Sequence, residues 1–316
     1  MFRLRKTKET DGWRAVTFQA GEIRAAHVCR PAGTAPVVAM VAFEADQDNA
    51  PAEALVRLAR NWQGQRHAFT TALHAADYHF LPVDAPNVPA TELKSAIAWT
   101  VASMIDINKE ENTIDVLSIP HGKDSAQRVR GMYAVVARTE LANDYHRRFQ
   151  AARLTLKAID SPEMAQRNLA ALLETEGHAV GLISFDAGGS LLTITSGGEL
   201  CLARRLDLTA AQMGHPDPAV RAGHHERVAL EIQRSLDHFN RQFTWTTVSL
   251  LAVAPFGDND GGLVAFLADN LETRVEPFLL DKVLDISRAP ELKDPSAQHR
   301  FLLPLGLALR HEEKAL

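Results

Sequence analysis

Residues 180–206 have the sequence VGLISFDAGGSLLTITSGGELCLARRL, and this stretch decides the fold class. It contains three apolar runs and two glycine pairs, in the order Val180–Phe185, Gly188-Gly189, Leu191–Thr195, Gly197-Gly198 and Glu199–Leu206. Apolar runs of this length predict strands, and glycine pairs between them predict tight turns, because glycine adopts the positive φ that such turns need. The sequence therefore predicts three successive strands joined by two hairpin turns.

The first part of the chain has a similar layout. Trp13–Phe18 and Ile23–Val28 flank a turn that contains Gly21, and Val37–Phe43 can extend the same sheet. Helical patterns and further short strands follow both groups of strands. The longest helix carries apolar residues at helical spacing, namely Val228, Ile232, Leu236, Phe239 and Phe243. We therefore predict an α/β chain made of two related halves.

Local signals set the limits of two further helices. Ser161 followed by Pro162 predicts a helix start, with serine as the N-cap and proline at the first helical position. Ser287–Gln298 is polar and predicts a loop, and Phe301–Arg310 predicts a last apolar helix.

Composition limits the class of protein. The chain has 316 residues, of which 46% are hydrophobic and 23% charged, as in ordinary globular proteins. A net charge of -5 argues against a general nucleic-acid binder, which needs a basic surface. The two cysteines, Cys29 and Cys201, form no C-x-x-C pair and favour a reducing compartment. Because the sequence has no apolar stretch of membrane-span length and no signal peptide, we expect a cytoplasmic protein whose membrane contact is only indirect.

Patterns of a catalytic or metal site are absent from the sequence. It contains no G-x-S-x-G elbow and no H-E-x-x-H motif. His224 and His225 are adjacent, so on a helix they point in different directions and chelate poorly. We expect no catalytic residue and no metal site.

Four segments, spread over the chain in a fixed order, carry a family resemblance. They are IDSPEMAQRNLA at 159–170, LLTI with RRLD within 191–207, EIQRSLDHF at 231–239 and PLGLALR at 304–310. Together they resemble the PilM family of actin-like pilus-assembly proteins, and within it the MSHA-type branch. No single segment is specific, and the resemblance rests on their order and spacing.

The resemblance implies a fold and a domain layout. The fold is actin-like (ribonuclease H-like), with two related subdomain halves around a cleft and a small inserted α/β subdomain. Residues 1–176 form the first half, with the insertion at about 87–156. Residues 177–298 form the second half, and a C-terminal helix at 299–311 packs back on the first.

The phosphate-binding turns of active actin-like ATPases are altered in this chain. Such turns usually contain D-I-G, in which the acid positions Mg²⁺ and water. The first turn here is Thr17-Phe18-Gln19-Ala20-Gly21, with no acid. The second is Ser184-Phe185-Asp186, with serine at the acid position, and Ala252-Val253-Ala254-Pro255 replaces the adenine-side glycine pair. We therefore expect a degenerate cleft without ATP hydrolysis and without a bound cofactor.

A residual nucleotide site stays open as an alternative. Its residues would be Asp186, Gly188, Gly189 and Ser190, with Asp186 at the acid position if the strand register shifts by two. The segment is not a P-loop, because no Gly-Lys-Ser/Thr follows. A hairpin turn explains the glycines equally well.

The resemblance also implies a function. It is that of a non-catalytic cytoplasmic scaffold, peripheral to the inner membrane, in a type IV (MSHA-like) pilus assembly complex. The scaffold would bind the short N-terminal cytoplasmic tail of an inner-membrane pilus protein and link it to the cytoplasmic motor ATPase; the residues of that partner-binding site are not assigned. Two alternatives remain. One is a divergent ATP-binding switch or weak ATPase, and the other is a type II secretion scaffold, whose chains usually continue into a membrane span.

Overall fold

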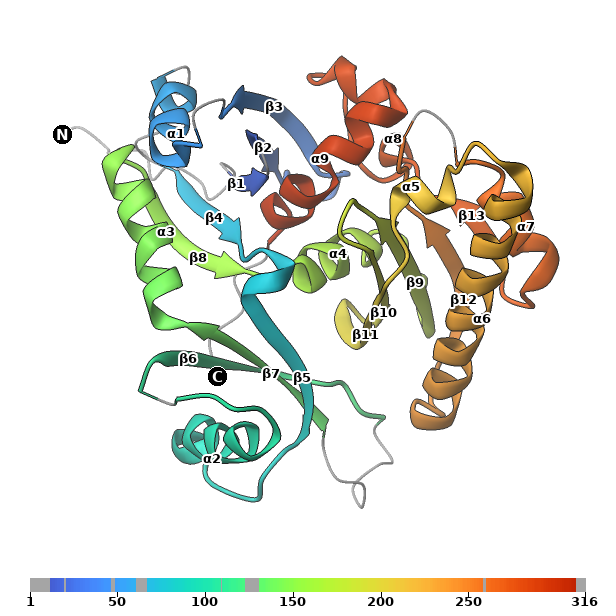
Figure 1. Cartoon of the computed structure of the whole chain (residues 1–316), viewed down its shortest axis with the longest axis horizontal. Helices are drawn as coiled ribbons and strands as arrows, with labels where there is room; N and C mark the ends of the chain where they lie inside the picture. The colour runs from blue at the N-terminus through green and yellow to red at the C-terminus, as the bar shows by residue number, and fades with distance from the viewer. Residues whose placement is uncertain are drawn as a thin grey trace.

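The computed structural model describes residues 12–19, 21–46, 49–60, 67–108, 110–122, 131–257 and 260–310. Within these ranges the chain forms two five-stranded sheets and one three-stranded sheet. The two larger sheets lie side by side, and the small sheet lies below the first of them (Figure 1). No helix in the described ranges is long and apolar enough to span a membrane.

The first large sheet has the strand order β3-β2-β1-β4-β8. Its strands are β1 (Trp13–Gln19), β2 (Glu22–Cys29), β3 (Val37–Ala45), β4 (Ala68–Ala72) and β8 (Thr155–Asp160). β1, β2 and β3 are antiparallel, and β4 and β8 run parallel to β1. Helices α1 (Pro51–Arg60) and α3 (Thr139–Ala151) cover one face, where Leu55 and Phe149 are fully buried against Phe69.

The second large sheet repeats this layout as β11-β10-β9-β12-β13. Its strands are β9 (His178–Phe185), β10 (Ser190–Ser196), β11 (Glu199–Leu206), β12 (Thr247–Val253) and β13 (Val275–Pro277). The antiparallel and parallel pairings match those of the first sheet, strand for strand. Helices of this half are α5 (Ala210–Met213), α6 (Pro218–Gln242), α7 (Leu263–Asn270) and α8 (Leu280–Val283). The three strands and two turns predicted from residues 180–206 are confirmed.

The small sheet has the order β5-β7-β6 and one helix. Its elements are β5 (Tyr78–Asp84), α2 (Ala90–Met104), β6 (Asn112–Ser118) and β7 (Gly131–Arg138). It therefore begins at Tyr78 and ends at Arg138, earlier at both ends than the 87–156 implied by the resemblance. The reason is that Tyr145 and Phe149 of α3 pack into the core of the first half instead.

Two helices connect the halves. α4 (Pro162–Ala170) follows the first sheet in sequence but packs on strands of the second, and α9 (Pro295–Ala308) follows the second sheet but packs on β1 and β2 (Figure 1). They cross at Gly306, where a Cβ atom would lie 2.4 Å from the carbonyl oxygen of Ala165. The Asn168 amide also donates to Gly306 O at 2.9 Å. Each half is thus covered by a helix from the other.

The helix limits predicted from sequence were right in one case and wrong in the other. Ser161 caps α4, its hydroxyl accepting the Met164 N–H at 3.4 Å. The prediction of a loop up to Gln298 is wrong, because α9 begins at Pro295 with Asp294 as its N-cap. A short 3₁₀ turn, η2 (Pro290–Lys293), precedes it. Proline is common at the first position of a helix, so Pro295 is compatible with this start. The prediction failed because the first turn of α9 is polar and gives no apolar helical pattern.

Candidate functional site

The β1–β2 and β9–β10 hairpin turns have the same register. Gln19 faces Glu22 across the β1–β2 turn. In the β9–β10 turn Asp186 takes the place of Gln19, because its N–H donates to the carbonyl three residues later at 2.8 Å. Thr17 and Ser184 therefore occupy equivalent positions, each two residues before the residue that opens its turn (Gln19 and Asp186). The equivalence of the hairpins therefore pairs Thr17 with Ser184, and Gln19 with Asp186.

Both hydroxyl side chains face the protein interior. Ser184 donates to the Gln166 side-chain oxygen at 2.7 Å, and the Gln166 amide donates to the carbonyl of Leu191 at 2.9 Å. Thr17 is 2% exposed, and among the described residues its hydroxyl has no hydrogen-bond partner. The Ser184 hydroxyl is therefore engaged by Gln166, and the Thr17 hydroxyl is enclosed by protein.

The four residues of the candidate nucleotide site lie together in the β9–β10 turn. Asp186 is exposed, and its carboxylate accepts the Gly188 N–H at 2.7 Å. Gly189 has φ +145°, and a Cβ there would lie 2.7 Å from Leu206 O, so glycine is required for the turn itself. Ser190 is buried at the start of β10. The carboxylate of Asp186 therefore holds the Gly188 N–H within the turn itself.

A charged cluster lies beside the first turn. The carboxylate of Glu22 forms ion pairs with Arg24 and Arg300. Arg24 also donates to Arg300 O at 2.9 Å, a carbonyl left without its helical donor because Pro304 has no N–H. The Arg300 guanidinium lies 3.7 Å from the centre of the Phe43 ring. Partial burial alone would raise the pKa of Glu22, but its hydrogen bonds and ion pairs to the two arginines outweigh burial and lower it.

His299 of α9 contacts the second half. Its Nδ1 lies 3.0 Å from Pro255 O, which makes Nδ1 the donor. Burial lowers the pKa of His299; Arg24 lowers it further, against the opposing effects of Pro255 O and Asp186. The adjacent Ala254 is buried, and its N–H donates to a β9 carbonyl. Neighbouring residues of α9 therefore contact both halves, His299 on one side and Arg300 on the other.

A second polar cluster joins three parts of the molecule. Glu163 of α4 is 1% exposed and pairs with Arg205 of β11, whose Nη2 and Nε lie 2.7 and 3.1 Å from one carboxylate oxygen. Tyr78, the first residue of the small sheet, donates to the other carboxylate oxygen. Burial, and then the charge of Glu163, raise the pKa of Tyr78. A tyrosine held in its neutral form beside a paired carboxylate is a structural link between these parts.

Other motif residues form similar links around α4. Arg167 donates to Gly198 O at 2.8 Å, in the β10–β11 turn. Arg310 pairs with Asp160 at 2.5 Å, which joins the chain after α9 to the end of β8. Three of the four segments that carry the family resemblance, at 159–170, within 191–207 and at 304–310, therefore meet around α4, whereas 231–239 packs within the second half.

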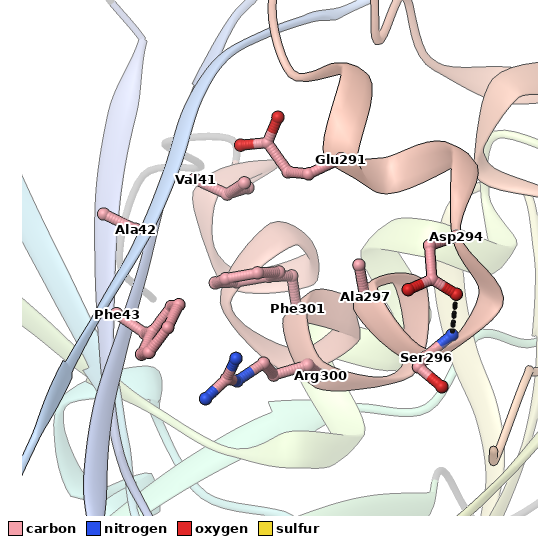
Figure 2. Close-up of a pocket in the computed structure, with 9 residues that line it drawn as sticks. All are labelled: Val41, Ala42, Phe43, Glu291, Asp294, Ser296, Ala297, Arg300 and Phe301. Atoms are coloured by element: carbon pink, nitrogen blue, oxygen red, sulfur yellow. Dashed lines mark hydrogen bonds between the residues drawn. The ribbon is translucent and has the colours of Figure 1, made fainter. Parts of the chain in front are cut away.

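A pocket of about 570 Å³ lies between β3 and the η2–α9 segment (Figure 2). Val41, Ala297 and Phe301 supply its apolar surface. The carboxylates of Glu291 and Asp294 stand on the helix side, and Asp294 accepts the Ser296 N–H at 3.1 Å. The sequence did not point to this pocket, because its two walls lie about 250 residues apart in the chain.

Sequence reasoning missed Glu22, Arg24, His299 and Arg300 altogether. Alternation along β2 gives no reason to single out its charged residues, and His299 directly follows the predicted loop Ser287–Gln298, where no pattern marked it as functional. Within the described residues, no three His, Cys, Asp or Glu side chains are grouped so that they could hold a metal ion.

Comparison with known proteins places the fold. No protein-family model matches the chain, and no curated protein sequence matches it significantly. A chain of the PilM–PilN type IV pilus biogenesis complex is similar in structure, with a TM-score of 0.71, 19% identity, and coverage of 95% of this chain and 98% of that one. The cytoplasmic domain of EpsL, an inner-membrane component of the type II secretion system of Vibrio cholerae, has a TM-score of 0.49, 14% identity, and coverage of 84% and 89%. A Bacteroides thetaiotaomicron protein with an actin-like ATPase fold has a TM-score of 0.49, 9% identity, and coverage of 93% and 99%. The chain has an actin-like fold.

Proposed function

We propose that this chain is a non-catalytic scaffold of a type IV pilus assembly complex of the MSHA type. It binds the short N-terminal cytoplasmic tail of an inner-membrane pilus protein and links that protein to the cytoplasmic motor ATPase. The observation that carries the proposal is the structural similarity, over nearly the whole length of both chains, to a component of the PilM–PilN complex. The four family-like segments support the same assignment.

The absence of catalysis is proposed from the chemistry of the turns. Phosphoryl transfer from ATP needs a Mg²⁺-binding carboxylate and free backbone N–H groups around the phosphates. Here Thr17 and Ser184 replace the acids, and the carboxylate of Asp186 takes the N–H of Gly188. The carboxylate of Glu22, next to the first turn, forms ion pairs with Arg24 and Arg300 of this chain, which neutralise its charge.

The links between the halves favour a scaffold that keeps one shape. Actin-like enzymes close and open around their nucleotide as two rigid halves. In this chain Glu163, Gln166 and Asn168 of α4 bond to the second sheet or to α9 and are themselves buried. A fixed arrangement of this kind suits a protein that presents a surface to partners.

A direct binding experiment tests the scaffold proposal. Fluorescently labelled peptides, covering the first 20 or so residues of each inner-membrane pilus protein from the same cell, are titrated with the full chain. We expect one tail to bind with a dissociation constant in the micromolar range, about -8 kcal/mol, and its scrambled version not to bind. If no tail binds and removal of the protein leaves pilus assembly unchanged, the proposal is wrong.

An ATP-binding switch is the second candidate, and one observation favours it. Asp186 is an exposed carboxylate in the β9–β10 turn, and a carboxylate is the kind of group that positions Mg²⁺ in phosphate-binding turns. If this switch exists, Asp186→Ala abolishes nucleotide binding. The scaffold proposal expects that variant to behave like the parent protein in any nucleotide assay.

A further inference from the structure

Within the part of the chain that the structure describes, β3 is an edge strand with a short uncovered window. Among the described strands it pairs only with β2. One end is closed by Asp285, which exchanges backbone hydrogen bonds with Val38 and Pro36, each at 2.9 Å. The other end is closed by Arg57, which donates to Ala45 O at 3.0 Å. The pocket beside β3 lies between these two closures.

The backbone groups in this window point outward. The N–H of Asp46 donates to Gly21 O at 2.8 Å, so the backbone groups of Asp46 and of the second and fourth residues before it point toward β2. Backbone groups in an antiparallel ladder alternate between the two sides of a strand. The carbonyl of Ala45, which accepts from Arg57, points away from β2. Phe43 and Val41 lie two and four residues before Ala45, so their N–H and C=O groups also point away from β2. An open edge of this kind is a template for one more strand.

The pocket gives this edge a chemical preference. Phe43 is 52% exposed, an unusual position for a phenylalanine, and Val41 and Phe301 continue its apolar surface. Glu291 and Asp294 are exposed on the opposite wall (Figure 2). Arg300, the cation among the described residues that line the pocket, is already paired with Glu22. The groove is therefore apolar at the strand and negatively charged at the helix.

We propose that the β3 edge binds an extended, basic segment of a partner protein as an added strand. Alternate side chains of the segment enter the pocket beside Val41 and Phe43, and a lysine or arginine meets Glu291 and Asp294. The identity of the segment rests on the proposed function: the cytoplasmic tail of an inner-membrane protein is rich in Lys and Arg next to its membrane span. Main-chain pairing gives such a complex its affinity, and the side-chain pocket gives its register.

A second copy of this chain suits the groove less well. Pairing of two β3 edges would bring the Glu291 and Asp294 carboxylates of both copies to one seam, where like charges repel. Sedimentation of the full chain tests this occupant. A concentration-dependent dimer that Phe43→Pro abolishes would overturn the choice of a partner segment.

Selection from a random peptide library tests the proposal with no assumption about the partner's sequence. Twelve-residue peptides are selected for binding to the full chain and then titrated by fluorescence anisotropy. We expect the enriched peptides to carry Lys or Arg and apolar residues at alternate positions. Failure to enrich any peptide, or enrichment of acidic ones, would overturn the proposal.

Two pairs of variants locate the binding site. Phe43→Ala and Phe43→Pro both remove the ring, but only proline removes the outward N–H and blocks strand addition, so we expect Phe43→Pro to bind at least about tenfold more weakly than Phe43→Ala. Glu291→Lys should weaken binding by about three- to tenfold, and Glu272→Lys, an exposed glutamate on the second half, should not. Equal binding by both members of each pair would contradict the groove.

A measurement on the peptide keeps the test valid if Phe43→Pro fails to fold. Methylation of alternate backbone nitrogens of a selected peptide blocks strand pairing in one register only, so one methylated series should lose binding and the other should keep it. Loss in both or in neither contradicts an added strand. The two proposals can fail separately. If a pilus-protein tail binds equally well to the Phe43 and Glu291 variants, the proposed binding site at β3 is wrong. If library peptides bind beside β3 but no pilus-protein tail binds, the proposed scaffold function is wrong.

Discussion

Glu163 shows how a single buried charge is held in this molecule. Its carboxylate is almost completely buried and has two partners, Arg205 and Tyr78, from different parts of the chain. Taking a charge out of water is costly unless hydrogen bonds and an opposite charge replace the solvent. The residue therefore connects α4, the second sheet and the small sheet at one point.

Replacing Glu163 with glutamine should weaken the fold. Glu163→Gln leaves Arg205 without its counter-charge, and because Arg205 is partly exposed we expect a loss of about 2 kcal/mol of unfolding free energy, below the 3–5 kcal/mol of a fully buried pair. Urea denaturation measures it. Glu276→Gln, which breaks an exposed pair with Arg274, is the matched control and should cost under about 1 kcal/mol. Equal losses in both variants would show that the buried link contributes nothing special.

His299 should make stability depend on pH. Its pKa is lowered in the folded protein, chiefly by burial, so the unfolded chain binds a proton more readily than the folded one. The stabilising contribution is complete above the ordinary histidine pKa of about 6.5 and is lost as the pH falls below it. We expect His299→Asn, which can still donate to Pro255 O, to lose less stability between about pH 7 and pH 5 than the parent protein does.

The exposed His79 provides the control for this measurement. The stability of His79→Asn should follow the pH dependence of the parent protein. If the His299→Asn curve also runs parallel to the parent curve, protonation of His299 is not linked to folding.

Individual side-chain partners were predictable only where they are local in sequence. The cap formed by Ser161 on the N–H three residues later follows from the dipeptide Ser161-Pro162 alone. The pair of Arg300 with Glu22 joins residues 278 positions apart, and no pattern in either neighbourhood announces it. Charge interactions between distant segments depend on the finished fold, so this cluster could not be found from local patterns.

At the scale of elements, the crossing of α4 and α9 is a close contact between the two halves. Gly306 allows the helices to approach, since a side chain there would meet the α4 backbone. The sequence predicted α4 and the successive hairpin strands of both halves, because periodicity and turn residues are local signals, but it placed the start of α9 too late. The resemblance implied that a C-terminal helix packs back on the first half, but no local pattern predicted that α4 covers the second sheet, because this is a matter of tertiary packing.

Gly306→Ala should destabilise the protein strongly. The added Cβ must displace backbone atoms of Ala165, so we expect a loss of about 2–3 kcal/mol of unfolding free energy. Gly223→Ala in α6 is the control, because nothing lies within 4 Å of a Cβ there and alanine favours a helix by up to about 1 kcal/mol. Denaturant titration of both variants measures the difference. A Gly306→Ala protein as stable as Gly223→Ala would mean that the helices do not cross as closely as described.

At the scale of the whole molecule, two halves of one topology carry equivalent hairpin turns and are joined by α4 and α9. The two turns have the same register, so that Thr17 corresponds to Ser184 and Gln19 to Asp186. The two hairpins could be predicted from the sequence, because they follow from the positions of glycines and apolar runs. The presence of Glu22, Arg300 and His299 around the turns could come only from the structure, since α9 reaches them from the far end of the chain.

Thermal unfolding with and without millimolar Mg-ATP, supported by calorimetric titration, tests most directly whether this actin-like chain works as a scaffold without nucleotide. A ligand at 100 times its dissociation constant stabilises a protein by about 2.7 kcal/mol, which would raise the melting temperature by about 5 °C or more. For a scaffold without nucleotide we expect no shift and no heat of binding, in the parent protein and in Asp186→Ala alike. A clear shift that Asp186→Ala removes would contradict the scaffold and establish an ATP-binding switch instead.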